Sequence, residues 1–90
     1  MSNSIVFYTK PGCHLCEDAR AMLNALQSEF QIAIQEIDIE RDPGLFKKYF
    51  DQIPVLVINQ RTTLAAPIRV EDVRAAFLTA QGSERAEEQR

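Results

Sequence analysis

Apolar residues recur along the 90-residue chain in blocks whose spacing alternates between that of a strand and that of a helix. The first block, Ile5–Tyr8, is continuously apolar, as is typical of a strand buried on both faces. A helix is predicted over about residues 14–28, because apolar residues recur there every three or four positions. Its inward stripe is predicted to contain Leu15, Ala19, Met22, Leu23 and Leu26. The next strand, over about residues 32–39, changes phase at Gln35–Glu36, which suggests either a bulge or a misassigned strand.

A short second helix is predicted after this strand. Asp42 suits an N-cap and Pro43 suits the first helical position, so the helix should run from Pro43 to about Asp51. Its apolar face is predicted to contain Leu45, Phe46, Tyr49 and Phe50.

A β-hairpin and a final helix complete the pattern. An apolar strand follows Pro54, then a hairpin loop at residues 59–63 and an edge strand over about residues 63–66, which Pro67 ends. The last helix is expected over about residues 70–81. Its core-facing positions are predicted to be Val73, Ala76, Phe77 and Ala80.

The elements follow the order β-α-β-α-β-β-α, which is an α/β pattern. A right-handed crossover makes the first two strands parallel, and the hairpin adds an antiparallel pair. We therefore expect a four-stranded mixed sheet flanked by three helices. One domain is expected over residues 1–82, followed by a charged tail at residues 83–90.

The composition narrows the classes of function that this domain can have. A net charge of −3 and a pI near 5.0 argue against a nucleic-acid partner. No apolar run approaches the ~20 residues that cross a bilayer, and the N-terminal MSNSIVFY lacks the features of an export signal. Two cysteines are too few for the disulfide framework of a small secreted domain. We therefore expect a cytoplasmic monomer that binds neither nucleic acid nor membrane.

The sequence Cys13-His14-Leu15-Cys16 follows the first strand and a turn at Lys10–Gly12, and it opens the first helix. A cysteine at a helix N-terminus faces unpaired backbone N–H groups and the positive end of the helix dipole. Both favour the thiolate, so Cys13 is expected to be the more acidic sulfur. Cys16 lies one turn later, where it can attack a mixed disulfide formed on Cys13. The pattern predicts a dithiol–disulfide centre in which Cys16 is the more buried sulfur.

The same cysteines admit other uses. They could form half of a zinc site with His14 as a third ligand, but structural zinc needs four ligands and His14 is the only histidine. Two chains could share an iron–sulfur cluster, or the thiols could be inert core residues. His14 either adds charge that stabilises the thiolate or is an exposed residue between the cysteines.

Ile53-Pro54 is the second segment with a functional interpretation. Proline lacks the N–H of a strand ladder, so Pro54 must start the strand or form a special turn, of which a cis bond is one kind. A redox centre needs a substrate-facing backbone edge beside its thiols. A cis bond would turn the Ile53 backbone toward such a groove, whereas an ordinary trans proline could equally start the strand.

The order of elements, YTKPGCHLC after the first strand and IPV before the third resemble the glutaredoxin-like branch of the thioredoxin superfamily, over roughly residues 4–81. The resemblance implies that Cys13 is the nucleophile and that Cys16 resolves the mixed disulfide. It implies a cis Pro54 across from the cysteines and an Ile53 whose backbone groups pair with the substrate. It also implies that Lys10 helps to hold a glutathione carboxylate. The predicted substrate-binding residues are Lys10, His14, Ile53 and Pro54.

One segment departs from the family pattern. Glutaredoxins follow the fourth strand with a Gly-Gly pair and an acidic residue that hold the γ-glutamyl end of glutathione, whereas this chain has no glycine there. Glu71 and Asp72 begin the last helix as the acidic residue does. However, Pro67 lacks an N–H group, and Arg69 is bulky. We therefore expect weak glutathione binding and poor deglutathionylation.

The predicted function is that of a small thiol–disulfide oxidoreductase that acts on a disulfide in a protein or a small molecule. It needs no bound cofactor and is re-reduced by glutathione or by a reductase. Two alternatives stand beside it. One is a non-catalytic thioredoxin-fold module that docks a partner beside Pro54, and the other is an iron–sulfur carrier that uses Cys13 from two chains.

Overall fold

The computed structural model describes residues 3–78. Its elements are, in order, β1 (Asn3–Thr9), α1 (His14–Leu26), β2 (Ile32–Asp38), the 3₁₀ turn η1 (Ile39–Arg41), α2 (Pro43–Tyr49), β3 (Val55–Ile58) and β4 (Thr62–Ala65). A last helix begins at residue 70 and continues to residue 78, where the described chain ends.

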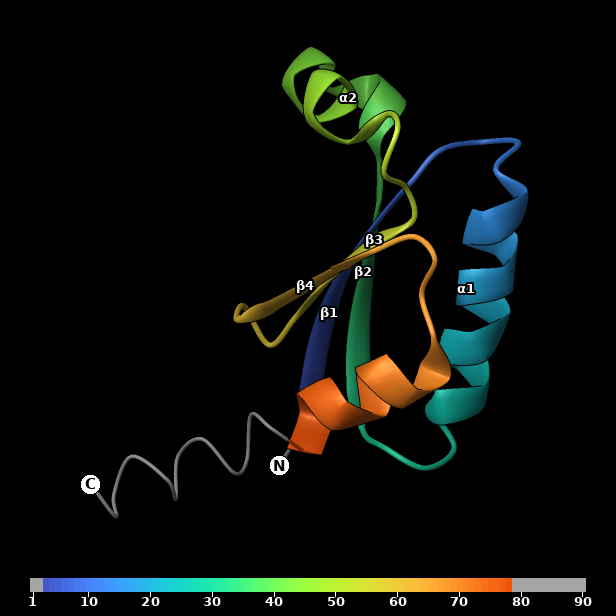
Figure 1. The fold of residues 1–90 in the computed structure, drawn as a ribbon, viewed down its shortest axis with the longest axis vertical. Helices are drawn as coiled ribbons and strands as arrows, with labels where there is room; N and C mark the ends of the chain where they lie inside the picture. Colours follow the sequence, from blue (N-terminus) through green and yellow to red (C-terminus); the bar gives the residue numbers. More distant parts are fainter. Residues whose placement is uncertain (1–2, 79–90) are drawn as a thin grey trace.

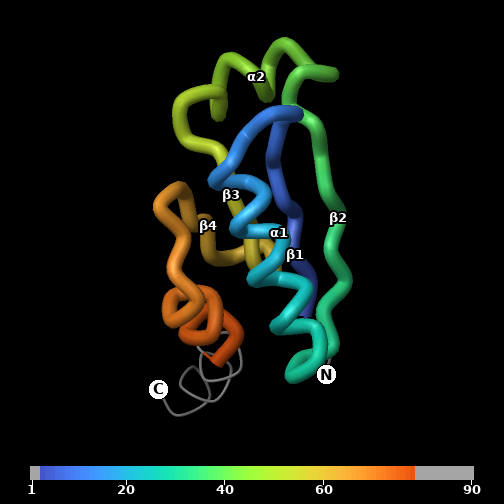
Figure 2. The backbone as a smooth tube through the Cα atoms, turned by 90° about the vertical axis from the view of Figure 1, so that its right-hand side faces the viewer, coloured from blue at the N-terminus to red at the C-terminus, as the bar shows by residue number. Residues whose placement is uncertain are grey.

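The four strands form one mixed sheet in the order β2-β1-β3-β4 (Figure 1). Parallel pairing joins β1 to β2, and antiparallel pairing joins β1 to β3 and β3 to β4. α1 and the helix at residues 70–78 pack on one face of the sheet, while α2 lies at the end where β1 and β2 finish (Figure 1, Figure 2). The predicted fold class, a four-stranded mixed sheet with three helices, is confirmed.

Most buried side chains lie between the sheet and these two helices. Ile5 and Phe7 of β1 point into this layer, because alternate strand residues face opposite sides of a sheet. Tyr8 points the other way and stacks on Tyr49 of α2, with ring centroids 4.6 Å apart. The main cluster consists of Ile5, Phe7, Cys16, Ala19, Leu23, Leu26, Leu56, Ile58, Val73, Ala76 and Phe77. A second cluster lies on the opposite face of the sheet, next to α2, and this side is called the α2 face. It consists of Ile39, Tyr49 and Val55.

α1 buries one stripe of side chains against the sheet, as its helical spacing predicted. The buried members of that stripe are Cys16, Ala19, Leu23 and Leu26. Leu15 was predicted to face inward, but its side chain is 55% exposed. The prediction was wrong because Cys16 takes the inward position in the first turn. Leu15 instead lines a surface groove with Pro54.

β2 pairs with β1 without interruption from Ile32 to Asp38, so the predicted bulge at Gln35–Glu36 does not form. The change of phase has another cause. Ile34 packs against the main cluster, whereas Glu36, two residues later on the same face, pairs with Arg20 of α1.

The second helix is capped as predicted, but it presents fewer side chains to the sheet than predicted. Asp42 Oδ1 accepts hydrogen bonds from the backbone N–H groups of Gly44 and Leu45, at 2.9 and 3.3 Å. Phe46 and Phe50, predicted to face inward, are 40% and 53% exposed. That prediction was wrong because the small second cluster accommodates only one stripe of a two-turn helix.

The hairpin and the last helix agree with the predictions. Asn59 and Gln60 have positive φ angles of 54° and 59°, and the Arg61 N–H donates to the Ile58 carbonyl at 3.0 Å. Positive φ angles at both central residues are characteristic of the type I′ turn, whose twist matches that of the flanking strands. The predicted core residues of the last helix that the structure describes, Val73, Ala76 and Phe77, are buried. Ala80 and residues 83–90 lie outside the described residues.

Candidate active site

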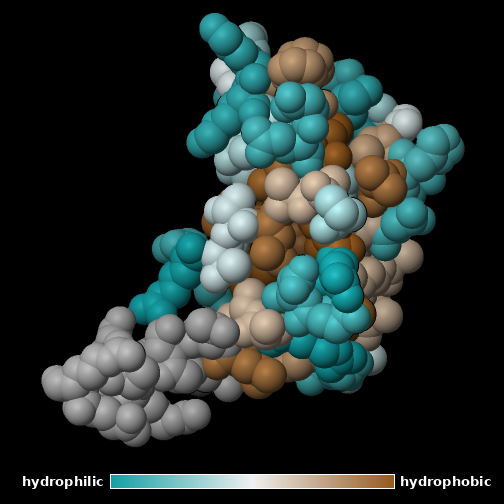
Figure 3. Space-filling view, viewed as in Figure 1, coloured by the Kyte–Doolittle hydropathy of each residue, from teal (hydrophilic) through white to brown (hydrophobic). Residues whose placement is uncertain are grey.

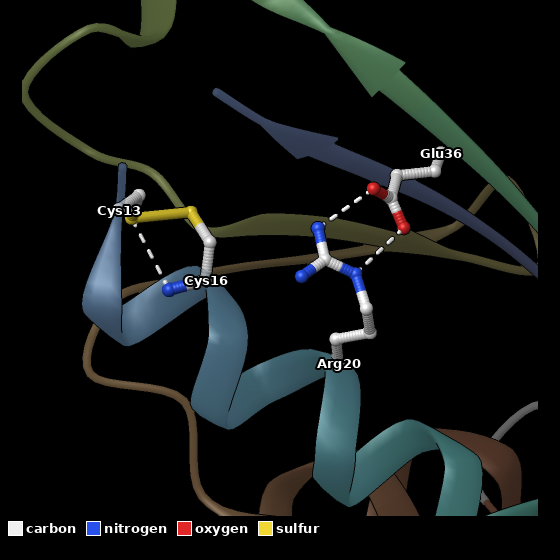
Figure 4. A network of polar contacts seen from close by, with 4 residues as sticks. All are labelled: Cys13, Cys16, Arg20 and Glu36. Atoms are coloured by element: carbon white, nitrogen blue, oxygen red, sulfur yellow. Dashed lines mark hydrogen bonds and ion pairs between the residues drawn. A yellow bond between two sulfur atoms is a disulfide. The ribbon is translucent and has the colours of Figure 1, made fainter. Parts of the chain in front are cut away.

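The predicted redox site begins where β1 ends. Gly12 has a φ of +79°, a conformation that favours glycine, and this turn delivers Cys13 to the N-cap position of α1. The backbone N–H of Cys16 donates a hydrogen bond to Cys13 Sγ at 3.1 Å (Figure 4). One of the unpaired N–H groups of the helix N-terminus therefore points at the sulfur, where it favours a thiolate.

Cys13 and Cys16 form a disulfide, with their Cα atoms 5.1 Å apart, and the structure is thus the oxidised form. The two sulfurs have different surroundings. Cys16 is only 1% exposed and belongs to the main cluster, whereas Cys13 is partly exposed at the rim of that cluster. The predicted difference in burial is confirmed. The arrangement gives one accessible sulfur backed by one protected sulfur.

The Ile53–Pro54 peptide bond is cis, as predicted. Pro54 is buried, and Ile53 is partly buried against both clusters. The Ile53 N–H donates to the Tyr49 carbonyl at 3.1 Å, so this N–H is occupied within the protein. Among the described residues the Ile53 carbonyl has no such partner. Of the two Ile53 backbone groups predicted to pair with substrate, the structure thus leaves only the acceptor free.

A groove of about 150 Å³ runs between α1 and the segment that follows β4. Its lining is mostly apolar and consists of Leu15, Asp18, Ala19, Met22, Pro54, Ala66, Pro67 and Ile68. In the space-filling view, apolar surface gathers over the middle of this face and is bordered by polar residues (Figure 3). Pro67, preceded by a second cis bond, lines the groove where the family pattern has glycines. The sequence did not reveal the groove because the helical spacing assigned Leu15 to the core, whereas Met22 packs against the main cluster, as predicted, and also lines the groove.

Lys10 and His14 do not line this groove. Lys10 borders a separate polar cavity of about 160 Å³, whose lining residues are Thr9, Lys10, Pro11, Arg20, Glu36 and Asp38. His14 is the exposed first residue of α1. The structure thus places Leu15 and Pro54 together on the groove, while Lys10 faces the β2 side of the cysteine turn.

An ion pair lines this polar cavity, and no pattern in the sequence predicts it. Arg20 Nη2 and Nε donate to the two carboxylate oxygens of Glu36 at 2.7 and 3.0 Å (Figure 4). The guanidinium lies over the ring of Phe7, 5.6 Å from its centroid. The hydrogen bonds that Arg20 donates to Glu36 raise the pKa of Arg20 above its ordinary value.

Two features are absent from residues 3–78. No three side chains of His, Cys, Asp and Glu lie close enough together there to hold a metal ion. None of the helices in that part of the chain is both long and apolar enough to cross a membrane.

Comparison with known sequences agrees with this geometry. The model of the family described as "Glutaredoxin-like domain (DUF836)" matches residues 4–78. The glutaredoxin-like protein YDR286C homolog of Dictyostelium discoideum is 37% identical over 68 residues, which are 67% of this chain and 61% of the relative. The match therefore spans less than two thirds of that relative's length.

Solved structures extend the comparison. Protein Ne2328 from Nitrosomonas europaea has a TM-score of 0.71 and 32% identity, covering 86% of this chain and 92% of that one. Protein XcR50 from X. campestris has a TM-score of 0.69 and 28% identity, covering 84% and 96%. Desulfothioredoxin from Desulfovibrio vulgaris Hildenborough has a TM-score of 0.67 and 24% identity, covering 88% of this chain and 82% of that one. At this level of identity it supports the fold alone.

Proposed function

The chain belongs to the glutaredoxin-like domain family, and we propose that it is a thiol–disulfide oxidoreductase whose catalytic residues are Cys13 and Cys16. The observation that carries the proposal is the pairing of an accessible sulfur at a helix N-terminus with a buried sulfur one turn later. The first can form a mixed disulfide with a substrate. The buried Cys16 sulfur can then attack the Cys13 sulfur, although Cys16 itself is not accessible to the substrate.

The reaction starts from the reduced form. The Cys13 thiolate attacks one sulfur of the substrate disulfide, forming a mixed disulfide and expelling the other sulfur as a thiolate. The Cys16 thiolate then attacks Cys13 Sγ, forming the Cys13–Cys16 bond and expelling the second substrate thiolate. The substrate gains two electrons, and the two protons lost by the cysteines complete its thiols. Two glutathione molecules, or a dithiol reductase, return the two electrons.

Substrate contact in this proposal falls on the groove beside the disulfide. The free carbonyl of Ile53 accepts a hydrogen bond from the substrate backbone, while Leu15 and Pro54 contact an apolar side chain. Lys10 lines the polar cavity beside the cysteine turn, and the exposed His14 begins α1, so that in this proposal both contact charged groups of the substrate. These contacts favour a protein or peptide disulfide as substrate. We propose that the protein acts as a monomer in a reducing cytoplasm.

Glutathione fits the groove less well. Pro67 offers no N–H donor, and Ala66 and Ile68 carry side chains where glycines would let a ligand approach the backbone. We expect weak binding of glutathione to the Cys16→Ser variant in an NMR titration, and slow turnover of a glutathionylated peptide. Saturation at low glutathione concentration with shifts around residues 66–72, together with efficient turnover, would contradict this part of the proposal.

The test of the proposed function is turnover of a peptide disulfide, with glutathione and with a thioredoxin-type reductase as alternative donors. We expect catalysis with at least one donor. We also expect the Cys16→Ser variant to accumulate a mixed disulfide on Cys13, visible as the mass of one added substrate thiol. No turnover with either donor, combined with no trapped adduct, would refute the oxidoreductase function.

A further inference from the structure

The Arg20–Glu36 pair stands beside the buried cysteine. Arg20 follows Cys16 by four residues on α1, and side chains with this spacing are neighbours on a helix surface, with Cβ atoms about 5–6 Å apart. Phe7 lies under the guanidinium and belongs to the same cluster as Cys16. Figure 4 shows Cys16 and Arg20 projecting from successive turns toward the sheet. The pair is therefore a charged group one helical turn from a cysteine that is only 1% exposed.

The Arg20 guanidinium has a free hydrogen-bond donor among the described residues. Its Nε and Nη2 atoms are bound to Glu36, and Nη1 has no hydrogen-bond partner among the described residues. Glu36 also offsets most of the Arg20 charge, because its two oxygens lie within hydrogen-bond distance. The electrostatic effect of Arg20 on its surroundings therefore depends on Glu36.

We propose, building on the proposed function, that Arg20 and Glu36 are a pair of positioning residues that sets the ionisation of the resolving cysteine, with Arg20 favouring the Cys16 thiolate and Glu36 restraining that effect. Burial among apolar side chains disfavours a thiolate, so Cys16 needs a compensating positive charge to act as a nucleophile near neutral pH. Arg20 is the only cation on the described part of α1.

Other charges surround the same turn of the helix. On α1 itself these are Glu17 and Asp18, with His14 as a titratable group, the turn contributes Lys10, and β2 contributes Asp38. The strand on the other side of the site, β3, carries no charged residue. Most of these groups are exposed and screened by solvent, whereas the Arg20–Glu36 pair is held in place by two hydrogen bonds.

The step that this pair controls is the resolution of the mixed disulfide. Cys16 loses its proton to solvent, and the resulting thiolate attacks Cys13 Sγ. The Cys13–Cys16 bond forms as the bond between Cys13 and the substrate sulfur breaks, and the substrate leaves as a thiolate. The rate of this step follows the thiolate fraction of Cys16, and hence the pKa of Cys16.

Stopped-flow reaction of the reduced protein with excess dithionitrobenzoate isolates the step. The first coloured thiolate is released when Cys13 attacks the probe, in a phase that depends on probe concentration. The second is released when Cys16 attacks Cys13, in a phase independent of probe concentration. The leaving thiolate stays ionised across the pH range used, so the pH profile of the second phase reports the ionisation of Cys16.

The two substitutions are expected to act in opposite directions. Arg20→Gln raises the pKa of Cys16 by up to about one unit and slows the second phase several-fold near neutral pH. Glu36→Gln releases the Arg20 charge, lowers the pKa of Cys16 and speeds the second phase. Arg20→Lys keeps the charge and should retain most of the wild-type rate.

The Arg74–Glu29 pair is a matched control, because its side chains are similarly exposed and it also forms two hydrogen bonds, both at 2.7 Å. Arg74→Gln and Glu29→Gln should leave the second phase unchanged. If Arg20→Gln and Glu36→Gln shift the profile in the same direction, or not at all, the proposal is wrong and the pair is structural only. If Arg20→Gln does not fold, Glu36→Gln and Arg20→Lys still decide the matter. A wild-type protein without a second phase would refute the proposed function itself.

Discussion

The two faces of the sheet are packed very differently, and the redox chemistry belongs to one of them. The face under α1 and the helix at residues 70–78 buries a cluster of eleven residues that includes Cys16. The α2 face buries only Ile39, Tyr49 and Val55 and leaves Phe46 and Phe50 in solvent. Cys16 is thus held within the larger buried cluster, and Cys13 stands at the rim of that cluster. A disulfide centre placed there can change its covalent state while its scaffold stays fixed.

The largest effect expected from this arrangement concerns the two sulfurs. In reduced single-cysteine variants, Cys13 (in Cys16→Ser) should react with iodoacetamide at least about tenfold faster at neutral pH than Cys16 (in Cys13→Ser). The reason is that Cys13 is accessible and faces the helix N-terminus, whereas Cys16 is buried. The measurement is the alkylation rate against pH for each variant. Faster labelling of Cys16 would reverse the assigned roles of the two cysteines.

A second prediction compares the stability that the two faces provide. Phe77→Ala should cost about 3–5 kcal/mol of unfolding free energy, since it opens a cavity in the main cluster. Tyr49→Ala should cost about 2 kcal/mol, because the second cluster is small and lies near solvent, where neighbours can close on the gap. Urea denaturation of the oxidised protein measures both. If Tyr49→Ala lowers the unfolding free energy as much as Phe77→Ala or more, the α2 face contributes at least as much to stability as the main cluster.

The contrast between the faces also explains which predictions from sequence succeeded. The cysteine turn, the Asp42 cap and the hairpin at Asn59–Gln60 depend on the local chemistry of a few adjacent residues, and each forms as predicted. The cis bond at Pro54 followed from a local motif and a family resemblance, and it is also confirmed.

The predictions that failed depend on tertiary packing. Helical spacing shows that Leu15, Phe46 and Phe50 share stripes with core residues, but it does not show where the sheet beneath the helix ends. The Arg20–Glu36 pair joins residues 16 positions apart, and only the parallel pairing of β1 and β2 brings them together. No local pattern in the sequence contains that information.

A third prediction concerns the Arg74–Glu29 ion pair, which links the helix at residues 70–78 to the turn that follows α1. The hydrogen bonds from Arg74 hold the pKa of Glu29 below its ordinary value of 4.5. A lowered folded-state pKa stabilises the folded protein above about pH 4.5, and this contribution is lost as the pH falls through the lower, folded value. Arg74→Gln should therefore flatten the fall of stability as the pH is lowered through and below about 4.5, by a small amount because the pair is exposed. Urea midpoints across this range measure the effect. An unchanged slope would mean that burial alone holds this helix in place.

The smallest effect is expected on the sparsely packed face. The rings of Phe46 and Phe50 stack on each other with centroids 5.7 Å apart, but they contribute nothing to either buried cluster. Replacing both by serine should change the unfolding free energy by no more than about 0.5 kcal/mol per site, as is usual for surface substitutions. Peptide-disulfide turnover should also stay unchanged, because neither residue lines the groove or the polar cavity.

Leu45→Ala on the same helix is the matched comparison. Leu45 is partly buried and packs against the second cluster. Leu45→Ala should therefore lower the unfolding free energy by a measurable amount, whereas the double serine variant should not. Turnover that falls in the double serine variant while its stability holds would show that the α2 face takes part in substrate contact. The separation between a catalytic face and an inert one would then have to be abandoned.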